Sequence, residues 1–263
     1  MALTSRGAVL TDQHRRDQVR LAITADSQAR RAWDRTLDLN DLKGSQPIWK
    51  RTMVELIETW WKISARTAAN YLPRFREAEI GEGFEVAVPE FDRSRVAREV
   101  DWTGAVNVLW HIARGETQAA AYVAARSLFL GIFHEAVLDG GRMVVRDAAK
   151  ADTRAIGWRR VSDGNPCAFC AMLVTRGPVY TSEQKAIARG SDMLAYHPHC
   201  GCTCEIVYGD WKPTEQEKRW IDDYYRAAES LPSKTPRTWD VVLPIMRRNG
   251  EFRDSPSVRD KSK

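Results

Sequence analysis

Cys167-Ala-Phe-Cys170 and His197-Pro-His199-Cys200-Gly-Cys202-Thr-Cys204 are the two stretches that decide how the second half of this chain folds. They contain all five cysteines of a 263-residue protein, and 26 residues separate them. Two short segments rich in thiolate and imidazole donors, joined by a loop, are what a tetrahedral zinc site requires. The pattern therefore predicts a metal-bound module of about forty residues.

The candidate metal ligands are Cys167, Cys170, His197, Cys200 and Cys202. The tight Cys-x-x-Cys turn lets two thiolates point at one ion while backbone N–H groups of the turn stabilise the sulfurs. His197 is expected as the third ligand, and the fourth is Cys200 or Cys202, between which spacing does not choose. Cys204 and His199 are further donors that could bind in their place or face the core or solvent.

A closed zinc site would act as a structural clip, contributing folding free energy without chemistry. Catalytic zinc keeps one position for water, whereas seven potential donors crowd this module. The sharper alternative makes one cysteine a nucleophile, with His197 or His199 as its base. A redox function for the Cys-x-x-Cys pair is disfavoured because no βαβ pattern surrounds it.

Composition predicts a globular protein without a strong preference for nucleic acid or membrane. Hydrophobic residues make up 43% of the chain, charged residues 29%, and the net charge is +5. This charge is mild for the length and is spread over several helical segments. No run approaches the roughly 18 consecutive apolar residues of a membrane span. An odd number of cysteines in a Cys-x-x-Cys arrangement indicates reduced thiols in an intracellular protein.

The fold class expected from the sequence is mainly α, with three segments. Residues 1–155 read as a helical domain, residues 156–210 as a small α+β module clipped by zinc, and residues 211–263 as a helix followed by a flexible basic tail. Apolar periodicity predicts an amphipathic helix or helix pair from Leu10 to about Leu39. A second long helix is expected from Pro47 to about Tyr71, where Leu72-Pro73 interrupts it.

Shorter helices are predicted after the caps Asp92 or Ser94 and Thr103. The most buried helix is expected over Thr117 to Leu138, with Asp139-Gly140-Gly141 as its terminator and an amphipathic helix from Met143 to Ala155 behind it. In the cysteine module, Val179 to Thr181 and Cys204 to Tyr208 read as short strands. The last helix is predicted over Thr214 to Ser230.

The string Asn165-Pro-Cys-Ala-Phe-Cys-Ala-Met-Leu-Val-Thr-Arg-Gly177, followed by Tyr180 and Tyr196-His-Pro-His-Cys-Gly-Cys202, resembles the phage Mu F-like family of minor head proteins. That family has a Cys-x-x-Cys turn, a variable loop and a closing His-Pro-x-Cys-x-Cys behind a long helical region. Residues 160–208 carry the resemblance. Position by position it makes the signature residues Cys167, Cys170, His197, Cys200 and Cys202, while Cys204 goes beyond the pattern.

The resemblance implies a minor capsid protein of a tailed phage, assembled in the bacterial cytoplasm and located at the portal or inside the procapsid. Its partners would be the portal protein and the scaffold or major capsid protein, with the helical half as the docking part. Similar actinophage proteins are often labelled capsid maturation proteases, which makes a peptidase using Cys200 or Cys202 with His197 the alternative. Packaged DNA is a third expected partner, through the Arg-rich N-terminal segment and the basic tail.

Overall fold

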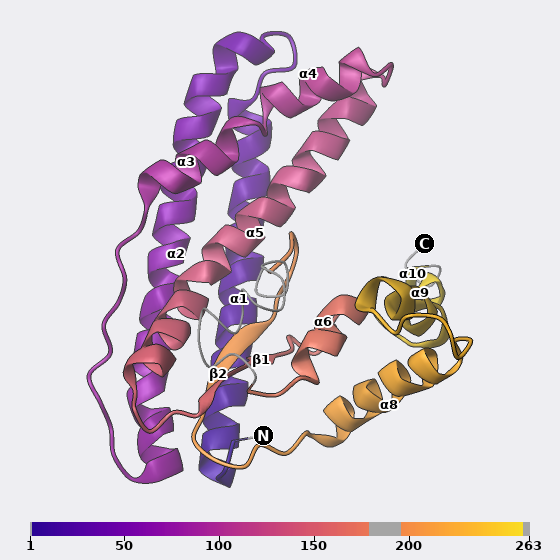
Figure 1. Ribbon diagram of the computed structural model, residues 1–263. Coiled ribbons are helices and arrows are strands. Elements are labelled where there is room, and N and C mark those ends of the chain that lie inside the picture. The colour runs from indigo at the N-terminus through magenta and orange to yellow at the C-terminus, as the bar shows by residue number, and fades with distance from the viewer. Residues whose placement is uncertain (1, 179–195, 260–263) are drawn as a thin grey trace.

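In the computed structural model of the protein, which describes residues 2–178 and 196–259, three long helices run side by side (Figure 1). They are α1 (Ser5–Thr36), α2 (Leu42–Ile80) and α5 (Gln118–Ala151). Thr4 and Asp41 cap the first two through side-chain oxygens that accept from backbone N–H groups. The mainly α fold class is confirmed, and the segment predicted from Leu10 to about Leu39 is one helix that ends at Thr36.

Helix α5 does not end at Asp139-Gly140-Gly141, so the predicted terminator is wrong. A Cβ on Gly140 would lie 2.2 Å from the carbonyl oxygen of Trp61, which means that the glycine lets α5 approach the backbone of α2. The Gly141 N–H donates to Ser64 Oγ at 2.9 Å, and Ser64 Oγ donates to Gln18 Oε1 at 2.8 Å. The two glycines thus mark the point where all three long helices meet.

Helix α2 also runs further than predicted, because it continues through Pro73 to Ile80. It ends at Gly81, whose φ of 83° is a left-handed conformation that favours glycine. An extended connection then leads to α3 (Arg93–Asp101), which Asp92 caps as predicted, and to α4 (Ala105–Ala113). Thr103 is not the cap of α4: that position is Gly104, and Thr103 Oγ1 instead donates to the Val100 carbonyl.

Among the described residues, one helix, α5, is long and apolar enough to cross a membrane by length and composition. Half of its most apolar window is buried inside the fold, where α5 packs against α1, α2 and α4. Phe129 and Phe133 on this helix are fully buried in the core that includes Trp33 and Trp49. The core of the fold thus accounts for the apolar sequence of α5, because a buried core helix can be as long and as apolar as a membrane-spanning one.

The cysteine module contains a two-stranded antiparallel sheet beside α5. Strand β1 (Gly157–Val161) pairs with β2 (Thr203–Val207), so that Arg159 lies opposite Glu205 and Arg160 opposite Cys204. Strand β2 confirms the predicted Cys204–Tyr208 strand, whereas β1 was not predicted. The predicted strand Val179 to Thr181 lies outside the described residues.

The C-terminal segment forms a side lobe around α6 (Ala168–Val174) (Figure 1). Helix α8 (Glu215–Glu229) matches its prediction and begins with a capping box between Thr214 and Glu217. The segment expected to be a flexible tail instead forms α9 (Trp239–Asn249) and the short α10 (Pro256–Arg259). Val242, Leu243 and Met246 of α9 are buried against α6 and α8, because the Trp239–Met246 patch has an apolar face to cover.

A single buried cluster crosses the predicted boundary at residues 155 and 156. It joins Phe75 of α2 and Val145 of α5 to Trp158, Cys170 and Cys204 of the cysteine module. The division into segments 1–155, 156–210 and 211–263 stays a prediction. The cysteine module nevertheless rests directly on the lower ends of the long helices.

Candidate metal centre

The first pair of donors stands at the beginning of α6. Cys167 is the N-cap residue, and its Sγ accepts from the backbone N–H of Cys170 at 3.4 Å. This is the turn that the Cys-x-x-Cys spacing predicts, with a backbone N–H directed at a sulfur. Both thiols are buried and free of disulfide bonds.

The second stretch is shaped by a tight turn against α5. His199 has a φ of 64°, its N–H donates to the Gly131 carbonyl at 3.2 Å, and the Cys200 N–H donates to the His197 carbonyl at 3.0 Å. His197 Nδ1 lies 2.8 Å from the Pro198 carbonyl, so this nitrogen carries the proton. Nε2 is therefore the nitrogen that could bind a metal, after it gives up any proton.

The five predicted ligands form one connected cluster. His197 Nε2 lies 3.2 Å from Cys167 Sγ and 3.1 Å from Cys170 Sγ, and Cys170 Sγ lies 3.4 Å from Cys200 Sγ. The donors form two groups with all atoms within 4.8 Å of one another, namely Cys167, Cys170 and His197, and Cys170, Cys200 and Cys202. Cys170 belongs to both groups and is therefore the centre of the cluster.

The donor set fits zinc. Around a tetrahedral zinc ion with bonds of about 2.3 Å to sulfur and about 2.0 Å to nitrogen, neighbouring ligand atoms lie about 3.5–3.8 Å apart. The separations of 3.1–3.4 Å within the two groups are a few tenths of an ångström shorter than this. No four of the described donors lie within 4.8 Å of one another, so the two groups would have to draw closer together around a single ion. Thiolates with one imidazole are the ligands of closed structural sites, so the residues could hold one such ion.

The two spare donors point elsewhere. Cys204 Sγ lies 2.8 Å from Tyr196 Oη in a buried hydrogen bond, and it belongs to neither donor group. His199 packs on α5, where a Cβ at Gly131 would come within 2.8 Å of its imidazole ring. The candidates for the fourth metal ligand are therefore Cys200 and Cys202.

The thiols and the imidazole shift one another's protonation. The neighbouring Cys170 thiol, and after it His197, lower the pKa of Cys167 to about 5, and Cys167 raises the pKa of His197 to about 9. Cys170 and Cys202 have raised pKa values, Cys170 through its Cys167 and Cys200 neighbours and Cys202 through Cys200 and burial. Crowded thiols cannot all ionise together, so metal binding here would release protons.

An open groove of about 680 Å³ borders the cluster. Cys167 and His197 line one side, and Phe169, Trp239 and Leu243 line the apolar part. The Phe169 and Trp239 rings meet edge to face at 5.8 Å, which ties α9 to the start of α6. Cys167 and His197 therefore border the groove, while Cys200 and Cys202 are almost fully buried.

Several residues around the centre were missed by sequence reasoning. Arg142 of α5 is buried against the backbone of the second donor stretch, and Tyr196 lies over its guanidinium. Glu135, one helical turn before Asp139, has a pKa raised to about 7 by burial and by Asp139. These residues lie before or beside the cysteine motif, and their positions in the sequence follow no pattern of metal ligands. Only the fold brings them to the centre.

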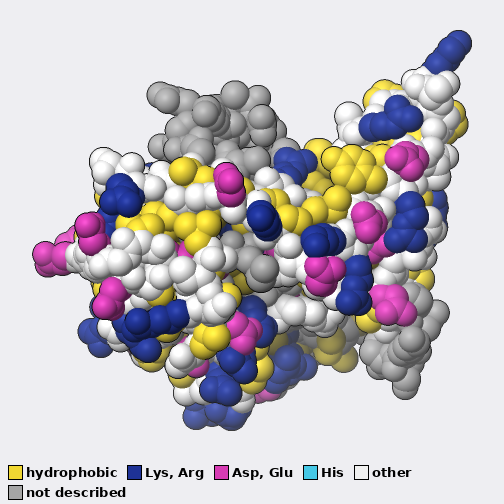
Figure 2. Space-filling view, turned by 90° about the horizontal axis from the view of Figure 1, so that it is seen from below, with side chains coloured by type: hydrophobic (Ala, Val, Ile, Leu, Met, Phe, Trp, Pro, Cys, Tyr) yellow, Lys and Arg dark blue, Asp and Glu magenta, His cyan; other side chains and the backbone are white. Residues whose placement is uncertain are grey.

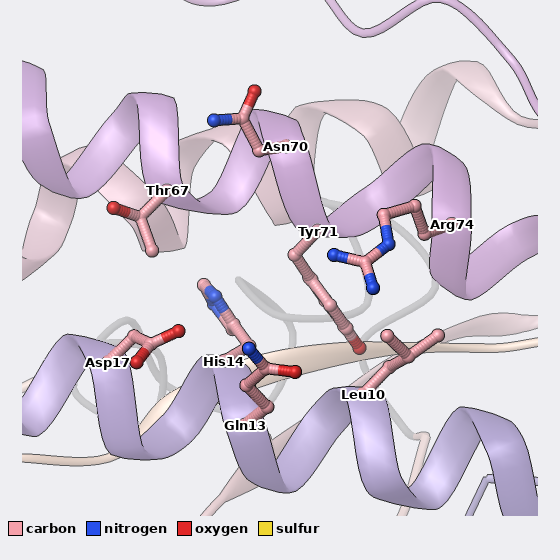
Figure 3. Close-up of a pocket in the computed structure, with 8 residues that line it drawn as sticks. All are labelled: Leu10, Gln13, His14, Asp17, Thr67, Asn70, Tyr71 and Arg74. Carbon is pink, nitrogen blue, oxygen red and sulfur yellow. The ribbon is translucent and has the colours of Figure 1, made fainter.

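A separate cavity of about 180 Å³ lies between α1 and α2, far along the chain from the cysteines. Figure 3 shows His14 and Tyr71 side by side beneath the polar residues Thr67 and Asn70. The two rings stack at 4.4 Å, and Thr11 Oγ1 bonds Tyr71 Oη at 2.8 Å. Burial lowers the pKa of His14 to about 3, so this histidine is a neutral packing residue.

Comparison with known proteins identifies the class and then the family. The fold and the cluster define a mainly helical protein with Cys/His groups close enough together to hold a metal ion. The chain belongs to the VG15 protein family, whose sequence profile matches residues 6–228, the cysteine module included. It is similar to the Gene 15 protein of Mycobacterium phage D29, with 26% identity over 206 residues, 62% of this chain and 74% of that protein.

No solved structure matches this chain. The comparisons thus support the prediction that this is a phage protein. Membership of the Mu F-like family stays a prediction, because the family match is to VG15.

Proposed function

We propose that this chain is a minor head-morphogenesis protein of a tailed phage, located at the portal or in the procapsid interior, whose cysteine module is held by a structural zinc ion. The observation that carries the proposal is the convergence of five donors, from two stretches separated by 26 residues, in a protein of a phage family. When bound, the ion would contribute folding free energy to a module whose described sheet has only two short strands. Binding to assembly partners is then the activity.

The helical half offers a surface for such partners at the end of the bundle where α3 and α4 lie (Figure 1). Helix α4 is apolar on both faces: Ala105 and Val108 are buried, while Val106 and Trp110 are exposed. Trp110 of α4 and Trp102, which ends α3, are 51% and 48% exposed. Exposed aromatic side chains gathered on one surface are typical of protein interaction sites. We assign this face to the portal, scaffold or major capsid protein.

Contact with packaged DNA is less well supported. On the face in Figure 2, Lys and Arg lie in separate groups with Asp and Glu among them. In α1, Arg15 and Arg16 both pair with Asp12. Paired charges leave little net positive field for a polyanion, so we do not place DNA binding at the centre of the function.

A capsid maturation peptidase is the second candidate, and one contact favours it. Cys167 and His197 form a thiol–imidazole pair at 3.2 Å that lines the open groove, as a nucleophile and base would. Two features favour metal instead. Cys170 lies at 3.1 Å on the same nitrogen, and His197 Nδ1 is oriented by a backbone carbonyl. Two sulfurs grouped about one imidazole nitrogen are arranged as the ligands of a metal ion would be.

The deciding experiment is elemental analysis of protein purified without added zinc, with a thiol count before and after chelation. About one zinc per chain, with three thiols that become reactive only after chelation, supports the structural centre. Absence of metal together with one hyper-reactive thiol would contradict it. In that case incubation with scaffold and major capsid protein, with and without a thiol alkylating agent, tests for cleavage.

A further inference from the structure

Arg142 of α5 is among the most deeply buried charges in the described part of the chain, with 2% of its surface exposed. A guanidinium is rarely buried unless its donors are satisfied, because desolvation is costly. Its Nε donates to the Cys202 carbonyl at 3.0 Å, and its Nη2 donates to the Cys200 carbonyl. One side chain from the helical half therefore holds the backbone at both C-terminal donors.

The same guanidinium also contacts the beginning of the donor stretch. It lies 3.6 Å from the ring centroid of Tyr196, and Arg160 covers the other face of that ring at 3.9 Å. Tyr196 directly precedes His197, and its hydroxyl bonds Cys204. Arg142 thus touches the residue before the first donor and the carbonyls of the last two, and so spans the whole segment that carries His197, Cys200 and Cys202.

The position of Arg142 is set by its own helix. Its Nη1 pairs with Asp139 Oδ1 at 3.2 Å, one turn earlier on α5. Its charge is also suited to the centre: three thiolates and a zinc ion carry a net charge of −1, which a buried cation offsets. Residues outside the ligand shell that fix the ligands typically change metal affinity by about 10–100-fold when mutated.

We propose that Arg142 is a positioning residue for the metal centre, which holds residues 196–202 in the conformation that binds the ion. Metal binding and the packing of α5 are then coupled through this side chain. The proposal rests on the structural zinc site proposed above. Metal binding then orders the lower half of α5 through this one guanidinium. Equally, loss of the guanidinium loosens three donors without removing any of them.

The test is the zinc affinity of the full-length protein, measured by competition with a chelating dye, for the wild type, Arg142→Met and Arg146→Met. Arg146 is the matched control, because it stands one turn further on α5 with its guanidinium over the Trp158 ring at 5.7 Å. We expect Arg142→Met to bind zinc at least about tenfold more weakly and Arg146→Met to stay within about twofold. Equal affinity of Arg142→Met and wild type, with circular dichroism unchanged, overturns the proposal.

Two further measurements keep the result interpretable if Arg142→Met folds poorly. Arg142→Lys keeps the charge but cannot donate to both carbonyls, and we expect weaker binding with an altered cobalt(II) absorption spectrum. In the wild type, zinc should slow amide hydrogen exchange around residue 142, and in Arg142→Lys this slowing should be lost. If the wild-type protein binds no zinc, both the metal site and this inference are refuted. If Arg142→Met and Arg142→Lys bind zinc as the wild type does, the inference alone is refuted.

Discussion

Arg159 on β1 lies directly opposite Glu205 on β2, and its Nε donates to the Glu205 carboxylate at 2.7 Å with both side chains almost inaccessible to solvent. The same guanidinium donates through Nη1 to Glu217 of α8, also at 2.7 Å. Glu217 in turn closes the capping box of α8. One arginine thus connects the sheet of the cysteine module to the C-terminal lobe.

Replacing Arg159 tests this connection. In Arg159→Ala two carboxylates stay buried without their cation, and such a loss typically costs about 3–5 kcal/mol of unfolding free energy. Urea unfolding of the zinc-loaded protein measures it. The control is Arg226→Ala, which breaks an exposed pair with Asp223 on the same helix α8 and is expected to change stability little. Similar midpoints for both variants would contradict the role given to Arg159.

Cysteine replacements distinguish the ligands. Cys170 belongs to both donor groups, so Cys170→Ser should abolish stoichiometric zinc binding. Cys204→Ser should keep one zinc per chain, because the Cys204 thiol bonds Tyr196 Oη and belongs to neither group. Elemental analysis after gel filtration measures both variants. Loss of zinc from Cys204→Ser with retention in Cys170→Ser would show that the donor set is wrong.

Acid sensitivity follows from His14. Its pKa is about 3 in the folded protein, because burial disfavours the charged ring, and about 6.5 in an unfolded chain. As the pH falls below about 6.5 the unfolded state takes up a proton that the folded state does not, so stability falls by about 1.4 kcal/mol per pH unit. His14→Phe, which can still stack on Tyr71, should reduce this slope between pH 6 and 4. Unfolding midpoints at constant ionic strength, compared with wild type, measure it.

The close approach of α5 to α2 gives a further prediction. Gly140→Ala places a Cβ 2.2 Å from the Trp61 carbonyl oxygen, so the helices must separate. We expect a destabilisation of about 3 kcal/mol, despite a gain of about 1 kcal/mol in helix propensity. Gly83→Ala is the control, since its Cβ would meet only the Pro73 carbonyl at an ordinary 3.8 Å. A thermal midpoint of Gly140→Ala at or above that of wild type would contradict the packing argument.

The parts of this fold that local patterns specify were predictable. Helical periodicity located the long helices, and the spacing of Cys167, Cys170 and His197 predicted donors that do converge. Longer-range contacts were not predictable. Gly140-Gly141 resembles a helix terminator in isolation, and only the Trp61 backbone explains its place inside α5. Strand β1 was missed because Arg159 and Arg160 suggest a surface segment until Glu205 and Tyr196 are seen beside them.

Side chains outside the ligand motif were missed for the same reason. Arg142 lies 25 residues before Cys167 and more than 50 before the carbonyls that it binds. Nothing in its own helix distinguishes it from Arg146, which is also on α5. The fourth ligand was ambiguous in sequence because Cys200, Cys202 and Cys204 alternate, and the strand that begins at Thr203 turns only the last of them toward Tyr196.

The exposed face of α4 provides the test of the assembly role. Val106 and Trp110 of α4, and Trp102 at the end of α3 before it, are about half exposed, so Trp102→Ser with Trp110→Ser should leave the thermal midpoint nearly unchanged. The double variant should enter procapsids in markedly fewer copies when it is produced together with the portal, scaffold and major capsid proteins, because aromatic anchors contribute most of the binding energy of an interface.

Quantitative immunoblotting of purified procapsids measures the copies. The control is Ile23→Ser, which removes an exposed apolar side chain from α1 and should not alter incorporation. Normal incorporation of the tryptophan variant would remove α4 from the docking surface. Equal loss in both variants would indicate that general surface polarity, rather than this helix face, controls entry into the head.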